Sequence, residues 1–324
     1  MYFNTKNNFY HGIMFHHFHD DKLHKRGQGS ISKDDFYKLI KFIGRKYILS
    51  ADKFFNRFKE NKIKPREVCL TFDDGIRCQY DIALPILEEL NIKSFFFVYS
   101  SLLLKEKTGF LEVYRYFRIN FFNNIDDFYN QFFKNLDKNL SLFFKNKDKI
   151  IDDTKVKFPH YSINDIKFRL VRDKLLTGEE YNTAMFSMFD EKNFNYKKSY
   201  EILFLNSENL KKIHELGHLI GLHSHTHPTL LENLSYDEQL NEYQNNISIL
   251  SEKLKINKTD IKYMSHPNGS YNNDTIKILT GLGIELGFKQ IMSIEPEKGM
   301  KKINNSFVEI ARQDHAGIIK MMNK

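Results

Sequence analysis

Short apolar runs that alternate with helix-forming segments constrain the fold of this chain more than any other feature. Residues 68–72 (VCLTF) form a β-prone run, apolar residues recur at helical spacing over 83–90, and a second β-prone run occupies 94–99. A strand, a helix and a second strand in this order are typical of a βαβ unit, whose strands are parallel and whose crossover is right-handed. The sequence therefore predicts an α/β protein.

The same alternation extends on both sides of this unit. A first strand is expected near 12–15. A helix is expected after Ser32, because Ser32 followed by Asp35 resembles a capping box. Further expected elements are helices near 210–216, 235–254 and 273–281, and strands at 219–222, 261–264, 284–288 and 307–311. Polar clusters follow several of these strands, and active sites of α/β sheets and barrels assemble at such strand ends.

Residues 101–200 interrupt the alternation. The stretch is rich in Phe, Asn, Asp and Lys, with helical-looking segments at 111–135 and 164–176. We interpret it as a mainly helical insertion in a single catalytic domain that spans 1–324, rather than as an independent domain. Such an insertion can shape a substrate pocket or serve as a packing appendage, and both interpretations stay open.

The composition is ordinary for a soluble globular protein, with 41% hydrophobic and 28% charged residues among 324. No apolar run approaches the roughly 20 residues that span a bilayer, and residues 1–6 lack the pattern of a signal peptide. Two cysteines, Cys69 and Cys78, are too few for a disulfide framework. We expect a cytoplasmic protein, and a peripheral position at the inner membrane surface is compatible with this.

The net charge of +8 comes from 49 basic and 41 acidic residues. It favours anionic partners such as nucleotide sugars, lipid-linked phosphates or membrane surfaces, although a general lysine bias explains it as well. The basic residues are dispersed, without an Arg-rich tract, so we expect no nucleic-acid partner. The sequence does not indicate an oligomeric state.

Two adjacent carboxylates, Asp73 and Asp74, follow directly after the run 68–72. Neighbours in an extended segment point to opposite sides, so one carboxylate can bind a metal ion while the other acts on a water molecule. Without a cation, two close carboxylates repel and the pKa of one rises. A strand-ending turn is the alternative, because Asp-Asp-Gly is common in turns.

His223 and His227 form a second candidate metal-binding pair, just before Pro228. Imidazole is the commonest neutral metal ligand, and the spacing allows both rings to meet one ion. The proline argues against a long helix, so we expect a loop after a strand, with His225 pointing elsewhere.

These motifs, 71–75 (TFDDG) and 223–228 (HSHTHP), resemble the first two motifs of the polysaccharide deacetylase (NodB-homology, carbohydrate esterase family 4) superfamily. The resemblance covers roughly 60–100 and 205–320. It implies a distorted (β/α) barrel of the NodB-homology type, with the long helical insertion left unexplained. It also implies removal of acetyl groups from sugars with a divalent metal ion.

By this resemblance, Asp73 is the general base, and Asp74, His223 and His227 bind the metal. The metal would polarise the acyl carbonyl and lower the pKa of its water, and Asp73 would remove the proton. Zinc suits this ligand set best, while cobalt, nickel, iron and manganese also fit, because ligand type alone does not settle selectivity.

The segment 265–271 (SHPNGSY) stands in the place of the third family motif, which often has an arginine before a Pro-rich turn. Here Ser265 stands nearest that position. The turn with Pro267 remains, so the N–H of Asn268 could stabilise the tetrahedral oxyanion, and His266 is a candidate acid. A plain turn between a strand and a helix is the alternative.

Arg312 and His315 follow the last expected strand, where the family places a late catalytic histidine. The resemblance implies that His315 protonates the leaving group, with Asp314 or another carboxylate setting its tautomer and with His266 as the rival acid. Arg312 could replace the missing arginine and orient Asp73.

His16 and His17 follow the first expected strand. Some family members carry a histidine near this place, so either residue could line the pocket. Solvated or hydrogen-bonded side chains are the alternative, and a second metal site is a third interpretation.

Together these features predict a metal-dependent hydrolase that removes an N-acyl group, normally acetyl, from a sugar in surface-glycan biosynthesis. It would act on a carbon–nitrogen bond other than a peptide bond. The expected substrate is an acylated nucleotide-linked or lipid-linked sugar. The alternatives are a sugar N-deformylase, a non-catalytic glycan-binding protein that retains the fold, and a structural metalloprotein, which would normally have four protein ligands.

Overall fold

The computed structural model describes residues 11–64, 66–104, 109–157, 161–291 and 306–323. Residues 1–6, in which we expect no signal peptide, lie outside these ranges. The chain divides into two compact units: Met1–Gly109 with Glu201–Lys324, called the barrel unit below, and Phe110–Tyr200, called the helical unit.

Seven parallel strands close into a barrel in the order β1-β4-β5-β6-β7-β8-β9. Because β1 pairs with both β4 and β9, the sheet has no edge. The strands are β1 (His11–Phe15), β4 (Val68–Phe72), β5 (Phe95–Val98), β6 (Leu219–Leu222), β7 (Tyr263–Ser265), β8 (Leu286–Ile291) and β9 (Ile310–Asp314). The predicted distorted (β/α) barrel is confirmed.

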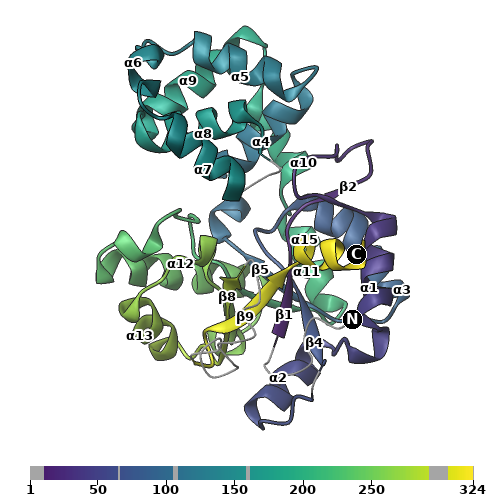
Figure 1. The fold of residues 1–324 in the computed structure, drawn as a ribbon. Helices are drawn as coiled ribbons and strands as arrows, with labels where there is room; N and C mark the ends of the chain where they lie inside the picture. Colours follow the sequence, from purple (N-terminus) through teal and green to yellow (C-terminus); the bar gives the residue numbers. More distant parts are fainter. Residues whose placement is uncertain (1–10, 65, 105–108, 158–160, 292–305, 324) are drawn as a thin grey trace. The chain divides into compact units, whose positions relative to one another are not determined.

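Helices surround this barrel, with α12 and α13 on one side and α1 and α3 on the other (Figure 1). The α-helices of the barrel unit are α1 (Lys33–Ile43), α2 (Ala51–Lys59), α3 (Leu84–Glu89), α11 (Ser207–Glu215), α12 (Tyr236–Leu254), α13 (Asn273–Gly281) and α15 (His315–Met322). A π-helical turn, η2 (Gln79–Ala83), leads into α3, and two short strands, β2 (Phe18–His19) and β3 (Ile31–Ser32), pair in parallel. Short 3₁₀ turns are η1 (Arg45–Tyr47), η3 (Ser100–Leu104), η4 (Leu231–Asn233), η5 (Lys258–Asp260) and η6 (Pro267–Gly269).

Local sequence signals explain where these helices begin. The Ser32 side chain accepts a hydrogen bond from the Asp35 backbone N–H and starts α1, and Ser235 forms a complete capping box with Glu238 at the start of α12. The capping box predicted at Ser235 is confirmed, and at Ser32 the structure shows the N-cap hydrogen bond of the predicted box.

Alternate residues of the strands serve two different cores. On β4 and β5, Phe72 and Phe96 pack into the large core that contains the helices, whereas Cys69, Phe95 and Phe97 belong to a second cluster with residues of β8 and β9. This alternation follows from the two-residue period of a strand. One set of side chains faces the surrounding helices and the other fills the barrel.

Three strands begin or end later than predicted, and local turns explain each shift. The N–H of Ile261 closes the 3₁₀ turn η5, which delays β7 until Tyr263. The Ile284 N–H bonds back to Leu279 at the end of a helix, which delays β8. A turn in which the Glu309 N–H bonds to the Ser306 carbonyl delays β9. Arg312 consequently lies inside β9 instead of after it.

The helical unit is built around phenylalanines. Phe117, Phe128, Phe132 and Phe168 are almost fully buried, and their rings contact one another or neighbouring aromatic rings. The helices are α4 (Phe110–Asn120), α5 (Ile125–Lys134), α6 (Leu140–Phe144), α7 (Asp148–Lys157), α8 (Ile163–Lys174), α9 (Gly178–Glu191) and α10 (Tyr196–Leu203), the last of which continues into the barrel unit. The helical character expected for about 101–200 is confirmed.

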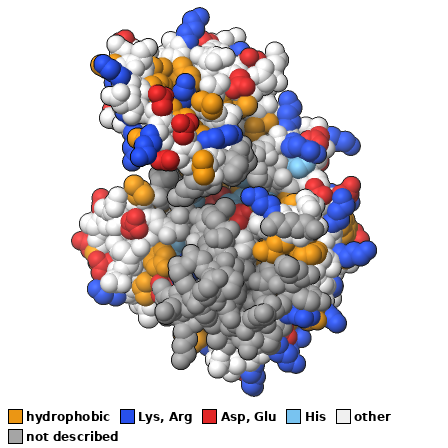
Figure 2. Space-filling model, in the orientation of Figure 1, with side chains coloured by type: hydrophobic (Ala, Val, Ile, Leu, Met, Phe, Trp, Pro, Cys, Tyr) orange, Lys and Arg blue, Asp and Glu red, His pale blue; other side chains and the backbone are white. Residues whose placement is uncertain are grey.

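Charged side chains of both signs are interspersed on the face of the molecule drawn in Figure 2. Among the described residues, no helix combines the length and the apolar character that crossing a membrane requires.

Candidate active site

Asp74, His223 and His227 meet beyond the C-terminal ends of β4 and β6. Oδ1 of Asp74 lies 3.1 Å from Nε2 of His223 and 3.2 Å from Nε2 of His227. One possible ligand atom from each residue lies within 4.8 Å of the others. Tetrahedral zinc ligands with bonds near 2.1 Å are roughly 3.4 Å apart, so these separations suit a single small cation.

The hydrogen bond of His223 supports the same interpretation. Its Nδ1 lies 2.8 Å from the Ser265 carbonyl oxygen, which can only accept, so Nδ1 carries the proton. In the neutral ring, Nε2 then presents a lone pair to the carboxylate of Asp74, which is also an acceptor. Two acceptors at this distance need a proton or a cation between them. The donor set therefore fits a divalent metal ion.

The backbone around these ligands is left-handed at three non-glycine residues: Asp74 has φ of 76°, Ser224 of 63° and His227 of 58°. Such residues cost on the order of 1–3 kcal/mol each and persist where surrounding contacts impose them. We expected an extended Asp73–Asp74 pair, and this geometry was wrong. The left-handed turn at Asp74, followed by Gly75 with φ of 62°, directs the two carboxylates to different partners.

Asp73 is held by Arg312 and Ser265 instead of by the histidines. The two terminal nitrogens of Arg312 donate to the two carboxylate oxygens of Asp73, each at 2.7 Å, and the Ser265 hydroxyl donates to Oδ2 at 3.1 Å. Burial by itself raises the pKa of Asp73, but the Arg312 charge and hydrogen bonds outweigh it and hold the pKa below its usual value. Asp73 is therefore ionised at neutral pH.

Gly12 makes this ion pair possible. It pairs with Cys69 of β4 on one side and with Arg312 of β9 on the other, so the Arg312 side chain must cross β1 to reach the end of β4. A Cβ atom at Gly12 would lie 2.9 Å from Cγ of Arg312. Gly12 was not predicted as a site residue, because its role depends on the register of three strands.

His16 lies beside the metal-binding triad. Its Nε2 is 3.8 Å from Oδ2 of Asp74, and its side chain is 24% exposed. The neighbouring ring of His17 lies 6.3 Å away, centroid to centroid. Among the described residues, only Asp74, His223 and His227 form a group with metal-binding geometry, so the second metal site gains no support.

Gln79 links the backbones that carry these groups. It is fully buried, and its Nε2 donates to the carbonyl of Asp73 at 2.6 Å and to that of His16 at 3.0 Å. Gln79 was not predicted from the sequence, since the π-helical turn that contains it, a feature frequent at functional sites, is visible only in the structure.

His315 lies at the start of α15 and is only 3% exposed. Its Nδ1 is 3.3 Å from the Met14 carbonyl oxygen, and its ring stacks on Phe15. Asp314 is 3.9 Å from Nδ1, and its carboxylate accepts the Ala316 N–H at the start of the helix. Burial lowers the pKa of His315, which favours the neutral ring.

His266, Pro267 and Asn268 form the turn after β7. Nε2 of His266 donates to the Val308 carbonyl at 2.9 Å, the ring stacks on Tyr271, and burial lowers the pKa of His266 to about 4. Pro267 is buried, while Asn268 is exposed with φ of 52°. These contacts favour a structural role for His266.

Comparison with known proteins agrees with this geometry. A search of curated proteins finds no match. The deacetylase PplD of Streptococcus pyogenes, in complex with acetate, has a similar structure, with a TM-score of 0.54 and 15% identity over 95% of this chain and 93% of that chain. The de-N-acetylase from Aggregatibacter actinomycetemcomitans gives a TM-score of 0.51, with 12% identity over 94% of both chains.

IcaB from Ammonifex degensii gives a TM-score of 0.50, with 13% identity over 88% of this chain and 84% of that chain. At such low identities the likeness shows a shared fold. The Polysaccharide deacetylase family model matches residues 60–116 and 178–287, which is more than half of the chain and includes both the Asp73–Asp74 pair and the loop 223–228. On this evidence, the chain belongs to the polysaccharide deacetylase family.

Proposed function

We propose that this protein is a divalent-metal-dependent hydrolase that removes an N-acyl group, normally acetyl, from a sugar in surface-glycan biosynthesis. Membership of the polysaccharide deacetylase family supports hydrolysis of an acylated sugar. One protein of similar fold is described as a de-N-acetylase, in line with an amide-linked acyl group. One observation supports the proposal most: the two adjacent carboxylates have different partners. Asp73 is bonded to the guanidinium of Arg312, whereas Asp74 lies beside the imidazoles of His223 and His227.

A divalent cation, most suitably zinc, held by Asp74, His223 and His227 would supply a Lewis acid for the acyl carbonyl and for water. Asp73 is the general base and takes the proton of the attacking water. Arg312 and Ser265 keep its carboxylate ionised and fix its orientation through three hydrogen bonds. The backbone N–H of Asn268 is the proposed donor to the tetrahedral oxyanion.

The leaving amine needs a proton, and His16 is the donor that the geometry favours. Its partly exposed side chain can meet a substrate next to Asp74. His315, the acid implied by the family resemblance, is almost completely buried, with Nδ1 directed at the Met14 carbonyl. His315 is therefore the second candidate for the same role.

A sugar N-deformylase would use the same residues and is the nearest alternative. A non-catalytic glycan-binding protein is less well supported, because a binding module needs no buried carboxylate held ionised by an arginine. The substrate class that we propose is an acylated glycan on a nucleotide or lipid carrier, processed in the cytoplasm or at the inner membrane surface.

Release of acetate from N-acetylated sugars by the metal-loaded protein tests this proposal. We expect activity that falls at least about a hundredfold in Asp73→Asn and in His223→Ala. The exposed residue Gln244 provides a matched control as Gln244→Ala. Unchanged activity in both site variants would refute the mechanism. A purified protein without any divalent ion, and without binding on titration, would refute the metal dependence.

A further inference from the structure

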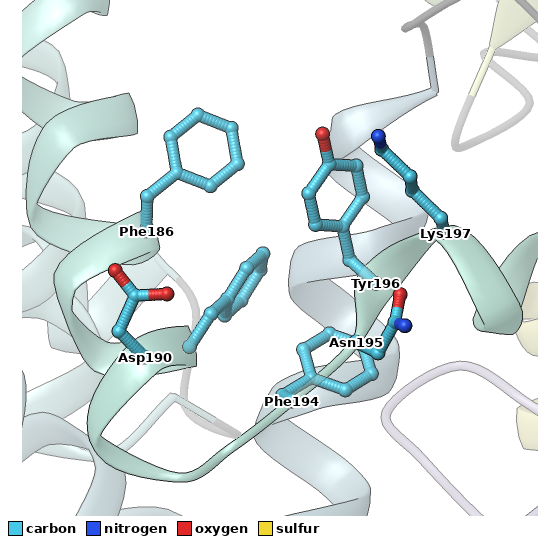
Figure 3. A pocket seen from close by; sticks show the side chains of 7 residues that line it. Phe186, Asp190, Phe194, Asn195, Tyr196 and Lys197 are labelled. Carbon is cyan, nitrogen blue, oxygen red and sulfur yellow. The ribbon is translucent and has the colours of Figure 1, made fainter.

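A pocket lies in the helical unit, between the end of α9 and the start of α10 (Figure 3). Its volume of about 410 Å³ lies within the range of natural small-molecule sites. The lining residues are Phe186, Phe189, Asp190, Phe194, Asn195, Tyr196 and Lys197. None of them belongs to the candidate active site.

The aromatic part of this pocket is packed against buried rings. Phe189 and Phe194 are buried with ring centroids 4.8 Å apart, and Phe189 contacts the partly exposed rings of Phe186 and Tyr196. These two outer rings lie 5.7 Å apart and are tilted by 37°. Rings held in this way offer apolar surface to a ligand at a small cost in side-chain entropy.

The polar part of the pocket carries no net charge. Asp190, Asn195 and Lys197 are all exposed, and Figure 3 shows the carboxylate on the α9 side and the ammonium group beside the Tyr196 hydroxyl. A site for an anion such as a phosphate normally has positively charged side chains and no carboxylate, so the presence of Asp190 beside Lys197 disfavours an anionic ligand. A purely apolar ligand would leave all three polar groups unused. A neutral molecule with apolar faces and many hydroxyl groups satisfies both parts.

We infer that this pocket is a sugar-binding site for a glycan, made of residues separate from those of the candidate active site. A pyranose ring has apolar C–H faces for Phe186 and Tyr196 and hydroxyl groups for Asp190, Asn195 and Lys197. The inference rests on the proposed function and narrows its substrate class. A lipid-linked or polymeric glycan has further sugar residues that such a site can bind, whereas a single nucleotide-linked sugar has none.

The test measures binding separately from hydrolysis. Full-length Asp73→Asn protein is titrated calorimetrically with the pentamer of N-acetylglucosamine, alone and with Lys197→Ala or Phe186→Ala added. We expect at least about fivefold weaker binding in both double variants. The exposed neighbour Lys198, which does not line the pocket, provides the control Lys198→Ala. Equal affinity in all variants, or no binding of the pentamer, would overturn the inference.

Acetate release from monomeric N-acetylglucosamine distinguishes this inference from the proposed function. Lys197→Ala in the otherwise wild-type chain is expected to leave that activity unchanged. If binding depends on Lys197 while the wild type releases no acetate, the pocket stands and the hydrolase proposal fails. If the wild type releases acetate but Lys197→Ala does not weaken binding of the pentamer, the hydrolase proposal stands and the pocket inference fails.

A different observation identifies two positioning residues for the loop that carries His223 and His227. The carboxylate of Glu242, on α12, accepts hydrogen bonds from the backbone N–H groups of His225 and Thr226, both at 2.8 Å. It also accepts the Thr226 hydroxyl at 2.6 Å. Three donors of one short loop thus converge on a single side chain.

Asn246 holds the start of the same loop. It is fully buried, its Oδ1 accepts the His223 N–H at 2.9 Å, and its Nδ2 donates to the Val98 carbonyl at 3.0 Å. Glu242 and Asn246 are four residues apart on one helix and therefore lie on the same face of α12. This helix face bonds to the start and to the middle of the segment that places the imidazoles.

The geometry assigns to Glu242 and Asn246 the task of imposing the left-handed conformations at Ser224 and His227. These conformations are unfavourable for residues with a side chain and need stabilising hydrogen bonds, which Glu242, Asn246 and the loop's own Ser224 hydroxyl supply. Outer contacts of this kind typically change metal affinity by a factor of about 10 to 100. The two residues act through the loop and do not touch the substrate.

Zinc affinity, measured by competition with a chromophoric chelator on the full chain, tests this assignment without any activity assay. We expect Glu242→Gln and Asn246→Ser to bind zinc about tenfold more weakly or worse. Asn245→Ala, at an exposed position on the same helix, is the control. A purely structural role would lower the melting temperature while leaving the affinity of the folded protein unchanged, and that result would overturn the assignment.

Discussion

Arg312 and Asp73 form a two-point ion pair across the end of the barrel, with both hydrogen bonds at 2.7 Å and both side chains almost fully buried. The planar guanidinium matches a carboxylate at two points, which fixes direction as well as charge. An ammonium group provides only a point charge. The pair therefore holds the base of the proposed reaction in one orientation.

Replacing Arg312 by lysine is expected to keep a positive charge and lose the orientation of Asp73. We expect kcat for acetate release to fall by a factor of about 10 to 100, because small displacements of a reacting group have effects of this size. Steady-state kinetics and a circular dichroism spectrum check this. Arg26→Lys, at an exposed position, should retain full activity. Full activity of Arg312→Lys would contradict the orienting role.

The two adjacent carboxylates should respond differently to the same substitution. Asp73→Asn is expected to keep zinc affinity within about threefold and to lose a factor of about 100 to 10,000 in kcat. Asp74→Asn removes a ligand and should abolish stoichiometric zinc binding. Metal content and acetate release, measured on the same samples, check both. Loss of zinc in Asp73→Asn with retention in Asp74→Asn would reverse the assigned roles.

The acid of the reaction can be identified by changing the leaving group. His16→Gln is expected to lower hydrolysis of an N-acetyl sugar about a hundredfold and to spare hydrolysis of 4-nitrophenyl acetate, whose leaving group needs no proton. His315→Gln should affect both substrates to a similar and smaller extent. The opposite pattern would assign the acid to His315.

The buried ring of His218 makes stability depend on pH. Its Nδ1 accepts the Ser94 N–H, its Nε2 lies 3.0 Å from Glu88, and burial lowers its pKa to about 4. The unfolded chain takes up a proton below about pH 6.5 and the folded chain only below about 4, so stability is lost as the pH falls between these values. The loss is at most about 3 kcal/mol.

Urea unfolding at pH 7 and pH 5 checks this prediction. His218→Asn can still accept from the Ser94 N–H but does not titrate, so its free energy of unfolding should fall less between the two pH values than that of the wild type. An equal fall in both proteins would show that His218 does not contribute.

The parts of the site that were predictable are those encoded within a few residues of one another. Asp73 and Asp74 end a strand, and His223 and His227 follow another, so the common edge of a parallel barrel brings them together. The caps at Ser32 and Ser235 were predictable for the same local reason.

The missing parts depend on register and on side chains from distant segments. Gln79 and Asn246 bond to backbone groups, which are the same in every residue type, so the identities of the contacted residues do not reveal these bonds. The sequence left Asp73–Asp74 open between an extended pair and a turn, and nothing in it indicated the left-handed backbone at Asp74. Arg312 was expected after a strand, and only the later start of β9 places it inside the barrel.

The absence of a side chain at Gly12 has a consequence for how this site is recognised. The arginine that holds the base comes from β9 and reaches across β1, where Gly12 has no side chain, whereas the family motif often has its arginine at the position that Ser265 occupies here. What the carboxylate requires is a guanidinium at one point in space, whichever strand supplies it. A comparison of sequence motifs would conclude that this chain lacks the arginine that holds the base. A comparison of where the charged groups lie in space would find that arginine present.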